Sequence, residues 1–237
     1  MLVSVVGSMH SSTTLVATIL GAHKDLHLIP KETWMFLNNR ANVVPSILDP
    51  KKYGTIGVIE KTPSHLFAMD TIESLYPDVK FIMTVRDYRD VVASVKNTHA
   101  APFPERDKTV LEYLTKTIEV ADREDVLLIK YEELIKDLEG HCKKMCEHLG
   151  LEYDEQMTRY YENRQQWWEH KNPEYIEPTD MKAFFQMRAW QVQQPIFDGS
   201  GRWKRELTLK DLEYFKSIDE KYTTRFNYEP TQWTENS

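Results

Sequence analysis

The feature that most constrains the fold is a regular alternation of short apolar segments with longer segments of helical periodicity. The short segments are rich in β-branched residues, and each precedes a stretch whose apolar residues recur at helical spacing. This pattern predicts an α/β fold, a central parallel sheet covered by helices on both faces. Crossovers should be right-handed, and ligands should bind at the carboxyl ends of the strands. The predicted strands are Leu2–Val6, Ile56–Ile59, Val79–Val85 and Val126–Lys130, and the predicted helices are Thr13–Ala22, Ser64–Leu75, Tyr88–Asn97 and Glu132–Leu149.

The last third of the chain differs, because aromatic residues are concentrated in it. The segment from Asp154 to Gln194 is helix-like and interrupted by prolines, so two or three helices joined by turns are expected. No Gly/Ser-rich linker divides the chain, which favours one domain over residues 1–237. The aromatic side chains either pack between helices or line a binding pocket, and packing is the favoured interpretation. The aromatic residues are Tyr160, Tyr161, Trp167, Trp168 and Trp190, and the prolines are Pro173, Pro178 and Pro195.

Composition and charge argue against several classes of function. The 237 residues carry a formal net charge of −7, whereas tight binding to nucleic acid needs a basic surface. The two cysteines, Cys142 and Cys146, are too few for a cysteine-only zinc site, and no metal is expected. The opening run Leu2–Val6 lacks a basic n-region and is too short to span a membrane. We therefore expect a soluble cytoplasmic protein without nucleic-acid or membrane partners; the sequence leaves its oligomeric state open.

The segment after the first predicted strand has the composition of an anion-binding loop. It is Gly7–Thr14, with the sequence GSMHSSTT, and a helix begins within it. A helix N-terminus offers free backbone N–H groups and the positive end of the helix dipole, and the hydroxyl groups of residues 11–14 can add donors. Alternatively, Ser12 or Thr13 simply caps the helix. The segment lacks the Gly-Lys-Ser/Thr ending of a Walker loop, which argues against a kinase or NTPase.

The third predicted strand ends in an arginine that is well placed to bind a phosphate group. Arg86 closes this strand, and Ser94 follows about two turns into the next helix. A guanidinium can bind phosphate through two hydrogen bonds, and the serine hydroxyl offers a further donor. The alternative interpretation is an Arg-Asp pair, Arg86 with Asp87, that caps the helix.

These two segments, in this order, resemble the motifs of PAPS-dependent sulfotransferases, where PAPS is 3′-phosphoadenosine-5′-phosphosulfate. The sequence from His10 to Thr14 resembles the family's 5′-phosphosulfate loop, Lys/Arg-Ser-Gly-Thr-Thr, with His10 in place of the cation and Ser12 in place of the glycine. The segment around Arg86 resembles the 3′-phosphate motif, with Tyr88 where the family usually has proline. The resemblance implies a P-loop-like α/β fold, PAPS as co-substrate, adenosine 3′,5′-bisphosphate (PAP) as product, and a 3′-phosphate held by Arg86 and Ser94.

The substitution at position 10 changes the expected electrostatics of the loop. In the resembling proteins a permanent cation lies over the sulfonate, whereas His10 is titratable. Because bound PAPS is highly anionic, we expect His10 to be protonated in the working complex. A neutral hydrogen-bond donor is the alternative. The serine at position 12 is expected to disfavour the positive φ that glycine adopts easily.

Three further segments extend the resemblance, one between the two motifs and two nearer the C-terminus. Glu60-Lys61-Thr62-Pro63 resembles a segment of carbohydrate sulfotransferases in which the lysine lies near the transferring sulfonate, which implies that role for Lys61. Tyr131 follows the fourth strand, where the family's tyrosine approaches the adenine. The segment Ser200–Thr208 resembles the Gly-x-Trp-Lys stretch that folds over the nucleotide, which implies that Gly201 and Arg202 bind the cofactor. The Arg-Lys-Gly that precedes this stretch in many members is absent, and the candidates to replace it are Arg202, Lys204 and Arg205.

The candidate general base is a glutamate near the N-terminus. The segment from Lys31 to Phe36 resembles the Lys-Glu-x-x-Phe-Phe pattern of carbohydrate and tyrosyl-protein sulfotransferases, which implies Glu32 as the base. His65 is the alternative, because cytosolic members use a histidine shortly after the Lys-Thr pair, although their histidine falls at the position of Pro63. A third candidate, His99, has no motif to support it.

The function implied is transfer of a sulfuryl group from PAPS to an acceptor hydroxyl or amine by in-line displacement. Glu32 would be the base, and Lys61 and His10 would stabilise charge. The acceptor is expected to be a small molecule or a glycan, and the overall acidity argues mildly against a heavily sulfated polysaccharide. Two alternatives remain: a P-loop-like phosphotransferase and a non-catalytic nucleotide-binding module.

Overall fold

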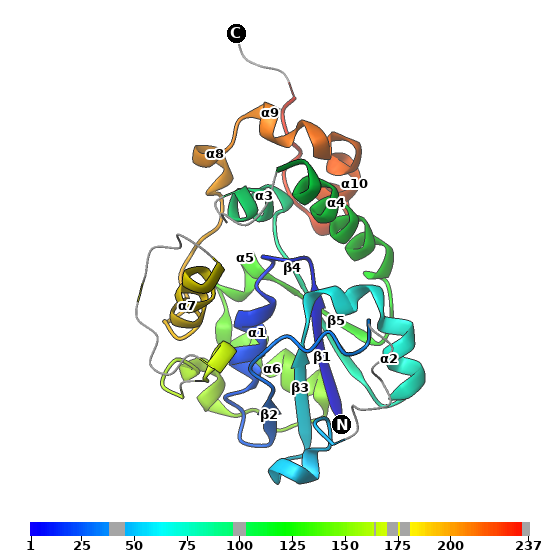
Figure 1. The fold of residues 1–237 in the computed structure, drawn as a ribbon, viewed down its shortest axis with the longest axis vertical. Coiled ribbons are helices and arrows are strands. Elements are labelled where there is room, and N and C mark those ends of the chain that lie inside the picture. Colours follow the sequence, from blue (N-terminus) through cyan, green and yellow to red (C-terminus); the bar gives the residue numbers. More distant parts are fainter. Residues whose placement is uncertain (38–45, 97–102, 164, 170–174, 176–180, 234–237) are drawn as a thin grey trace.

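The computed structural model shows a five-stranded, fully parallel sheet with the strand order β2-β3-β1-β4-β5 (Figure 1). It describes residues 1–37, 46–96, 103–163, 165–169, 175 and 181–233. The fold class predicted from the alternating pattern is confirmed. The strands are β1 (Leu2–Gly7), β2 (Leu26–Leu28), β3 (Gly57–Lys61), β4 (Lys80–Val85) and β5 (Val126–Lys130).

Helices of both the α and the 3-10 type connect and cover the strands. The α-helices are α1 (Thr13–Leu20), α2 (Met69–Leu75), α3 (Tyr88–Lys96), α4 (Phe103–Val120), α5 (Tyr131–Leu134), α6 (Leu138–Leu149), α7 (Met181–Gln191), α8 (Trp203–Glu206), α9 (Leu209–Leu212) and α10 (Lys216–Phe226). The 3-10 helices are η2 (Pro50–Tyr53), η3 (Pro63–Phe67), η4 (Glu155–Arg159), η5 (Trp167–Glu169) and η6 (Glu213–Phe215). In the part of the chain that the structure describes, no helix is both long enough and apolar enough to cross a membrane.

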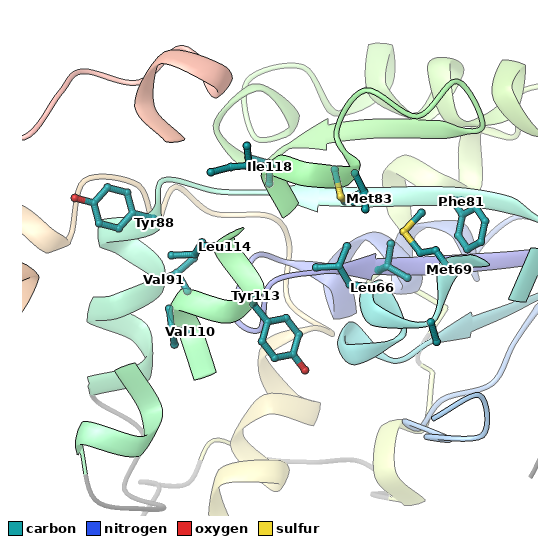
Figure 2. Packing of buried hydrophobic residues seen from close by; sticks show 14 of the residues in the cluster. Leu66, Met69, Phe81, Met83, Tyr88, Val91, Val110, Tyr113, Leu114 and Ile118 are labelled. Atoms are coloured by element: carbon teal, nitrogen blue, oxygen red, sulfur yellow. The ribbon is translucent and has the colours of Figure 1, made fainter. Parts of the chain in front are cut away.

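The side chains of the strands alternate between two hydrophobic clusters, one on each face of the sheet. In β1, Leu2 and Val6 join the first cluster, whereas Val3 and Val5 join the second, because successive side chains of a strand point to opposite faces. Residues of α2, α4 and α10 complete the first cluster, and residues of α1, α6 and α7 complete the second. Figure 2 shows the first cluster, in which Leu114 and Val110 of α4 lie beside Val91 of α3. Both faces are therefore covered, as the apolar strands require.

The carboxyl ends of three strands meet at one edge of the sheet. β1 lies between β3 and β4, and its residues Val5 and Gly7 are in register with Lys61 and Thr84 respectively. After β1 the chain turns towards β2 and β3 on one side, and after β3 it crosses to β4 on the other. Such a reversal opens a crevice beyond the carboxyl end of the central strand. The loop after β1, the end of β3 and Arg86 are brought together there.

Several element boundaries differ from the sequence-based expectation. The predicted helix Glu132–Leu149 is two helices, because the chain breaks before Asp137, whose carboxylate accepts a hydrogen bond from the Gly140 N–H and caps α6. The predicted helix Ser64–Leu75 is likewise divided into η3 and α2 at Ala68, which has a non-helical conformation.

Several elements were not predicted, namely β2, η2, α4 and the helices after Gln194 (α8, α9, η6 and α10), and the segment from Asp154 to Gln194 is only partly helical. β2 is too short to give a periodic signal. α4 was missed although Val110, Leu114 and Ile118 recur every four residues along it. In the segment from Asp154 to Gln194, the described residues form η4, η5 and α7, and Pro173 and Pro178 lie outside the described residues.

We expect Leu114→Ala to lower the free energy of unfolding by about 2–5 kcal/mol, because Leu114 is fully buried in the first cluster and the substitution leaves a cavity. Alanine favours helix, so the loss would report packing rather than helix propensity. The matched control is Leu75→Ala in α2, where the leucine is 47% exposed and the expected change is within about 0.5 kcal/mol. Urea unfolding measures both changes, and equal losses would contradict the placement of α4.

Candidate active site at the carboxyl ends of the strands

The loop after β1 adopts the conformation of a glycine-containing loop in spite of its serine. Ser12 has a φ of 83° and His10 a φ of 61°, both in the left-handed region. Ser12 therefore adopts a positive φ in spite of the steric cost that glycine would not have there. Ser12 occupies the N-cap position of α1, but its side chain makes no capping hydrogen bond, which also removes the interpretation that this serine merely caps the helix.

Hydrogen bonds tie this loop to the end of β4. The Ser11 hydroxyl donates to the Ser8 carbonyl (2.6 Å) and lies 2.7 Å from the Thr84 hydroxyl. Gly7 is required for this close approach, since a Cβ atom there would lie 2.7 Å from the Thr84 carbonyl oxygen and φ is +147°. The loop is thus fixed against the neighbouring strand.

Two adjoining cavities open at this edge of the sheet and share His10, Ser12 and Arg188 as common walls. The smaller, of about 70 Å³, is lined by Arg86 and Ser94 and also by Tyr131, Tyr160 and Ile196. The larger, of about 320 Å³, is lined by Thr13, Thr14, Glu32, Trp34, Arg106, Tyr113, Trp168, Phe184 and Phe185. Most of the residues predicted to bind the cofactor therefore line one cavity or the other.

Arg86 is held in the smaller cavity with part of its hydrogen-bonding capacity unused. Its Nη2 donates to the Gly199 carbonyl (2.6 Å), and its guanidinium carbon lies 4.5 Å from the centre of the Tyr131 ring. Among the described residues, no partner contacts its buried Nε. Asp87 pairs with Arg89 instead, at 2.7 Å, and its carboxylate accepts a hydrogen bond from the Arg89 N–H (3.0 Å) at the start of α3. An Arg-Asp pair therefore does cap this helix, but Arg86 takes no part in it. A buried donor without a partner is costly, and a bound anion would satisfy it.

Ser94 links α3 to the loop after β1. Its hydroxyl lies 2.8 Å from Nδ1 of His10, so the two sequence motifs are in direct contact. Burial, together with charge repulsion from Arg188, Arg86, Arg106 and Arg202, lowers the pKa of His10 to about 3. His10 is therefore neutral at physiological pH in the unliganded protein, whereas the resembling loops have a permanent cation at this position.

Tyr131 fixes the segment that closes the smaller cavity. Its hydroxyl donates to the Phe197 carbonyl (2.9 Å) and accepts from the Gly199 N–H (3.0 Å). Gly201, with a φ of +70°, donates its N–H to the Asp90 carboxylate at 2.7 Å. The C-terminal segment is thus attached to both α5 and α3.

Arg202 is placed differently from expectation. It forms an ion pair with Glu206 at 2.8 Å and is not among the residues that line the two cavities. Lys204 and Arg205 are exposed. The described residues therefore give no support to direct cofactor binding by these three cations.

Lys61 and Glu32 form a short ion pair beside the larger cavity. Lys61 Nζ lies 2.6 Å from Glu32 Oε1, and it lies over the rings of Trp167 and Trp168, at 5.0 and 5.5 Å from their centres. The Lys61 side chain is fully buried, whereas that of Glu32 is 24% exposed. Burial lowers the pKa of Lys61, and the neighbouring carboxylates Glu32 and Glu60 oppose this shift. Glu32 thus faces the cavity, and the buried Lys61 forms an ion pair with it on the side away from the cavity.

His65 lies in the protein interior, away from both cavities. Its Nδ1 is 2.7 Å from Glu60 Oε2, and its Nε2 accepts a hydrogen bond from the Phe36 N–H (3.4 Å), which places the proton on Nδ1. Burial raises the pKa of Glu60, but hydrogen bonds from His65, Thr62 and Thr33 outweigh burial and lower it overall. Both nitrogens of His65 are therefore occupied, and the geometry does not favour it as a base. His99 lies outside the described residues.

Two arginines at the site were missed by sequence reasoning. Arg188 of α7 lines both cavities, and Arg106 of α4 lines the larger. A signal for Arg188 was present, because Phe184, Arg188 and Gln191 recur at helical spacing and all three face the cavities. The segment that holds Arg106 was not recognised as a helix.

The aromatic residues of the C-terminal third serve two purposes. Trp167 and Tyr160 are buried in the second cluster, as expected for packing. Trp168, Phe184 and Phe185 instead line the larger cavity, so the packing interpretation is incomplete for this segment.

Comparison with known sequences supports one family. A family profile described as "Sulfotransferase family" matches residues 38–155. A Caenorhabditis briggsae protein named as a protein-tyrosine sulfotransferase is 27% identical over 195 residues, which are 68% of this chain and 69% of that protein. The Mycobacterium bovis omega-hydroxy-beta-dihydromenaquinone-9 sulfotransferase is 32% identical over 111 residues, or 40% of this chain and 29% of the relative. The chain thus spans less than a third of the mycobacterial protein.

Solved structures show the same fold. The sulfotransferase domain of the curacin biosynthetic pathway superposes with a TM-score of 0.63 at 13% identity, covering 97% of this chain and 98% of that domain. Mouse sulfotransferase SULT7A1, crystallised with PAP, has a TM-score of 0.58 at 15% identity, covering 93% and 84% of the two chains. The family profile and the relatives named as sulfotransferases thus support the sulfotransferase family for this chain, and the parallel sheet, the hydroxyl-rich loop after β1 and Arg86 at the end of β4 agree with it.

Proposed function

We propose that the chain transfers the sulfuryl group of PAPS to an acceptor hydroxyl, with Glu32 as the general base. The observation that carries the proposal is the buried guanidinium of Arg86, whose Nε has no partner among the described residues. It faces a cavity that also contains Ser94 and adjoins a second cavity that contains Glu32. One cavity suits the anionic donor, and the other suits the acceptor.

The contacts of the smaller cavity suggest how the donor binds. The 3′-phosphate would contact Arg86 and Ser94, and the adenine would lie towards Tyr131 and the segment that its hydroxyl holds. The 5′-phosphosulfate would then extend along the loop from His10 to Thr14, at the N-terminus of α1. The PAP complex of the mouse relative supports this choice of nucleotide.

The reaction would be an in-line displacement at sulfur. The acceptor oxygen forms the new bond to sulfur as the bond from sulfur to the bridging oxygen breaks, and the electron pair of that bond remains on the 5′-phosphate of PAP. The acceptor proton passes to the Glu32 carboxylate, which faces the larger cavity. Lys61, held within 2.6 Å of Glu32, would orient the carboxylate.

The walls of the larger cavity favour an acceptor with a flat apolar group next to its nucleophile. Five aromatic side chains line this cavity together with the carboxylate of Glu32, and aromatic rings pack well against other flat rings. A phenolic hydroxyl would fit, in line with the relative named for protein tyrosine. The five rings are those of Trp34, Tyr113, Trp168, Phe184 and Phe185.

A screen of acceptors with labelled PAPS tests the proposal directly, and calorimetry with PAP against ATP tests the alternatives. Transfer of label to a phenol or alcohol, with preference for PAP over ATP, is the expected result. Preference for ATP would favour a phosphotransferase, and tight PAP binding without transfer to any acceptor would favour a non-catalytic module.

Arg86→Ala should weaken binding of PAP by about 10- to 100-fold, because it removes a charge-assisted hydrogen bond to the 3′-phosphate. Binding of 5′-AMP, which lacks that phosphate, should change by less than about threefold. Isothermal titration calorimetry gives both values. Arg159→Ala, which removes a surface arginine paired with Glu155, is the control and should leave both affinities unchanged. Equal losses of affinity for PAP and 5′-AMP would contradict the assignment of Arg86 to the 3′-phosphate.

Glu32→Gln should lower turnover by about two to four orders of magnitude, the range for loss of a general base, while PAP affinity stays within about twofold. His65→Gln is the comparison. It should lower the melting temperature, because it breaks a buried hydrogen bond with Glu60, yet leave the turnover of folded protein largely intact. An active Glu32→Gln together with an inactive but folded His65→Gln would reverse the two roles.

The pH dependence of kcat/KM for PAPS should show no ionisation of His10 between pH 5 and pH 9. The lowered pKa of about 3 leaves the imidazole of the free enzyme neutral throughout that range, and kcat/KM reports the free enzyme. His10→Asn can keep a hydrogen bond to Ser94 and should retain activity within about tenfold. A fall in kcat/KM as the pH rises through about 6.5, absent in His10→Asn, would show instead that His10 works as a cation.

A further inference from the structure

The loop after β1 contains no permanent cation. Sulfuryl transfer moves negative charge onto the bridging oxygen of the leaving nucleotide, and preorganised positive groups that face this oxygen lower the barrier. His10 occupies the position of the cation in the resembling loops, but it is partly buried, neutral and hydrogen-bonded to Ser94. The N-terminus of α1 offers only a partial charge.

Lys61 is not available to this oxygen in the observed arrangement. Its ammonium group is fully buried and lies 2.6 Å from Glu32. It also lies over two tryptophan rings of η5, Trp167 and Trp168, and it lines neither cavity. Its charge is therefore used to hold the base.

Arg188 is the cation that lies between the two cavities. It lines both of them, together with His10 and Ser12. Its Nη1 donates to the side-chain oxygen of Gln191, one turn along α7, and it forms no ion pair with any carboxylate of the described residues. Burial and the nearby charge of Arg86 lower the pKa of Arg188 to about 10, so the group remains protonated at neutral pH. Arg188 and Arg86 are neighbouring cations without a carboxylate partner among the described residues, and they are therefore a suitable site for an anion with several charges.

The helix that carries Arg188 is packed firmly over the site. Ala189 and Val192 are buried in the second cluster. The ring centres of Phe184 and His10 lie 6.3 Å apart, and those of Phe185 and Trp168 lie 5.3 Å apart. Arg188 is therefore positioned by a helix whose neighbouring side chains contact both the donor loop and the acceptor cavity.

We propose that Arg188 is a catalytic residue of this chain: it binds the 5′-phosphosulfate end of PAPS and takes over the function of the basic residue that His10 replaces. The inference rests on the proposed function. As the acceptor oxygen bonds to sulfur, the bridging bond breaks, and its electron pair converts the 5′-phosphate from monoanion to dianion. The guanidinium donates hydrogen bonds to this phosphate and keeps its own protons, while the acceptor proton goes to Glu32.

The test measures affinity for three nucleotides that differ in their phosphates: PAP, 5′-AMP and adenosine 3′-phosphate. Arg188→Met should weaken PAP and 5′-AMP by about 10- to 100-fold, because both carry the 5′-phosphate, and leave adenosine 3′-phosphate within about twofold. Arg86→Ala should give the opposite selectivity. Lys182→Met, which removes an exposed cation from the same helix, is the matched control and should change none of the three affinities. Isothermal titration calorimetry supplies all values.

A second variant and a compensating one keep the test decisive. If Arg188→Met does not fold, Arg188→Gln removes the charge while retaining a polar side chain of similar reach. The double variant His10→Lys/Arg188→Met should regain at least about tenfold in 5′-AMP affinity, because it restores a cation beside the same phosphate. A residue that acts only through packing would not be compensated in this way. Equal losses for the 3′- and 5′-phosphate ligands, unchanged affinities, or no recovery in the double variant would each overturn the proposal.

Failure of this inference is distinguishable from failure of the proposed function. If the wild-type protein binds none of the three nucleotides, the PAPS proposal fails, and the role of Arg188 fails with it. If the wild-type protein binds PAP through Arg86, but Arg188→Met has no effect on 5′-AMP, only the role of Arg188 is wrong.

Discussion

The site depends above all on the parallel pairing of β1 with β3 and β4. This pairing aligns the carboxyl ends of the three strands, with Val5 beside Lys61 and Gly7 beside Thr84. The chain then reverses direction across β1, which leaves a crevice at that end of the sheet. The donor loop, the Lys61–Glu32 pair and Arg86 meet there because each follows, or ends, one of these strands. The two hydrophobic clusters fix the pairing by burying alternate side chains of β1 on opposite faces.

Electrostatic organisation divides this crevice into two parts. On the donor side, Arg86 and Arg188 are cations that partly repel one another, and burial keeps the intervening His10 neutral. On the acceptor side, the only carboxylate among the described residues lining the larger cavity is that of Glu32, and Lys61 neutralises it from behind. Unused positive charge therefore faces one substrate, and a base faces the other, as expected for transfer of an anionic group to a hydroxyl.

A buried polar network behind Glu32 stabilises this arrangement. The Glu60 carboxylate accepts hydrogen bonds from Thr33, Thr62 and His65. Thr33 directly follows Glu32, and Thr62 directly follows Lys61, so one carboxylate joins the two segments that carry the ion pair. Since a half-satisfied buried network is costly, this network restricts both segments to a single geometry. His65 thus belongs to the support of the base, although its position in the sequence made it a competing candidate.

The sequence by itself determined the fold class and the local anion-binding segments. The alternation of strands and helices, the hydroxyl-rich loop directly after β1 and the arginine at the end of β4 are each encoded in a short stretch of the chain, where periodicity and composition are informative. For the same reason, the short strand β2 was missed, and the breaks at Ala68 and Asp137 fell inside predicted helices. These breaks depend on single residues rather than on a repeated pattern.

Which charged side chains contact one another depends on how distant segments pack. Lys61 pairs with Glu32 across 29 residues, and His10 meets Ser94 across 84. Arg188 reaches the site from a helix far along the chain, whereas Arg202 turns to Glu206 instead. The protonation state of His10 likewise follows from burial and from arginines brought near by folding. Local sequence specifies the type of each side chain, but its neighbours, its solvent exposure and hence its charge are set by the packing of distant segments.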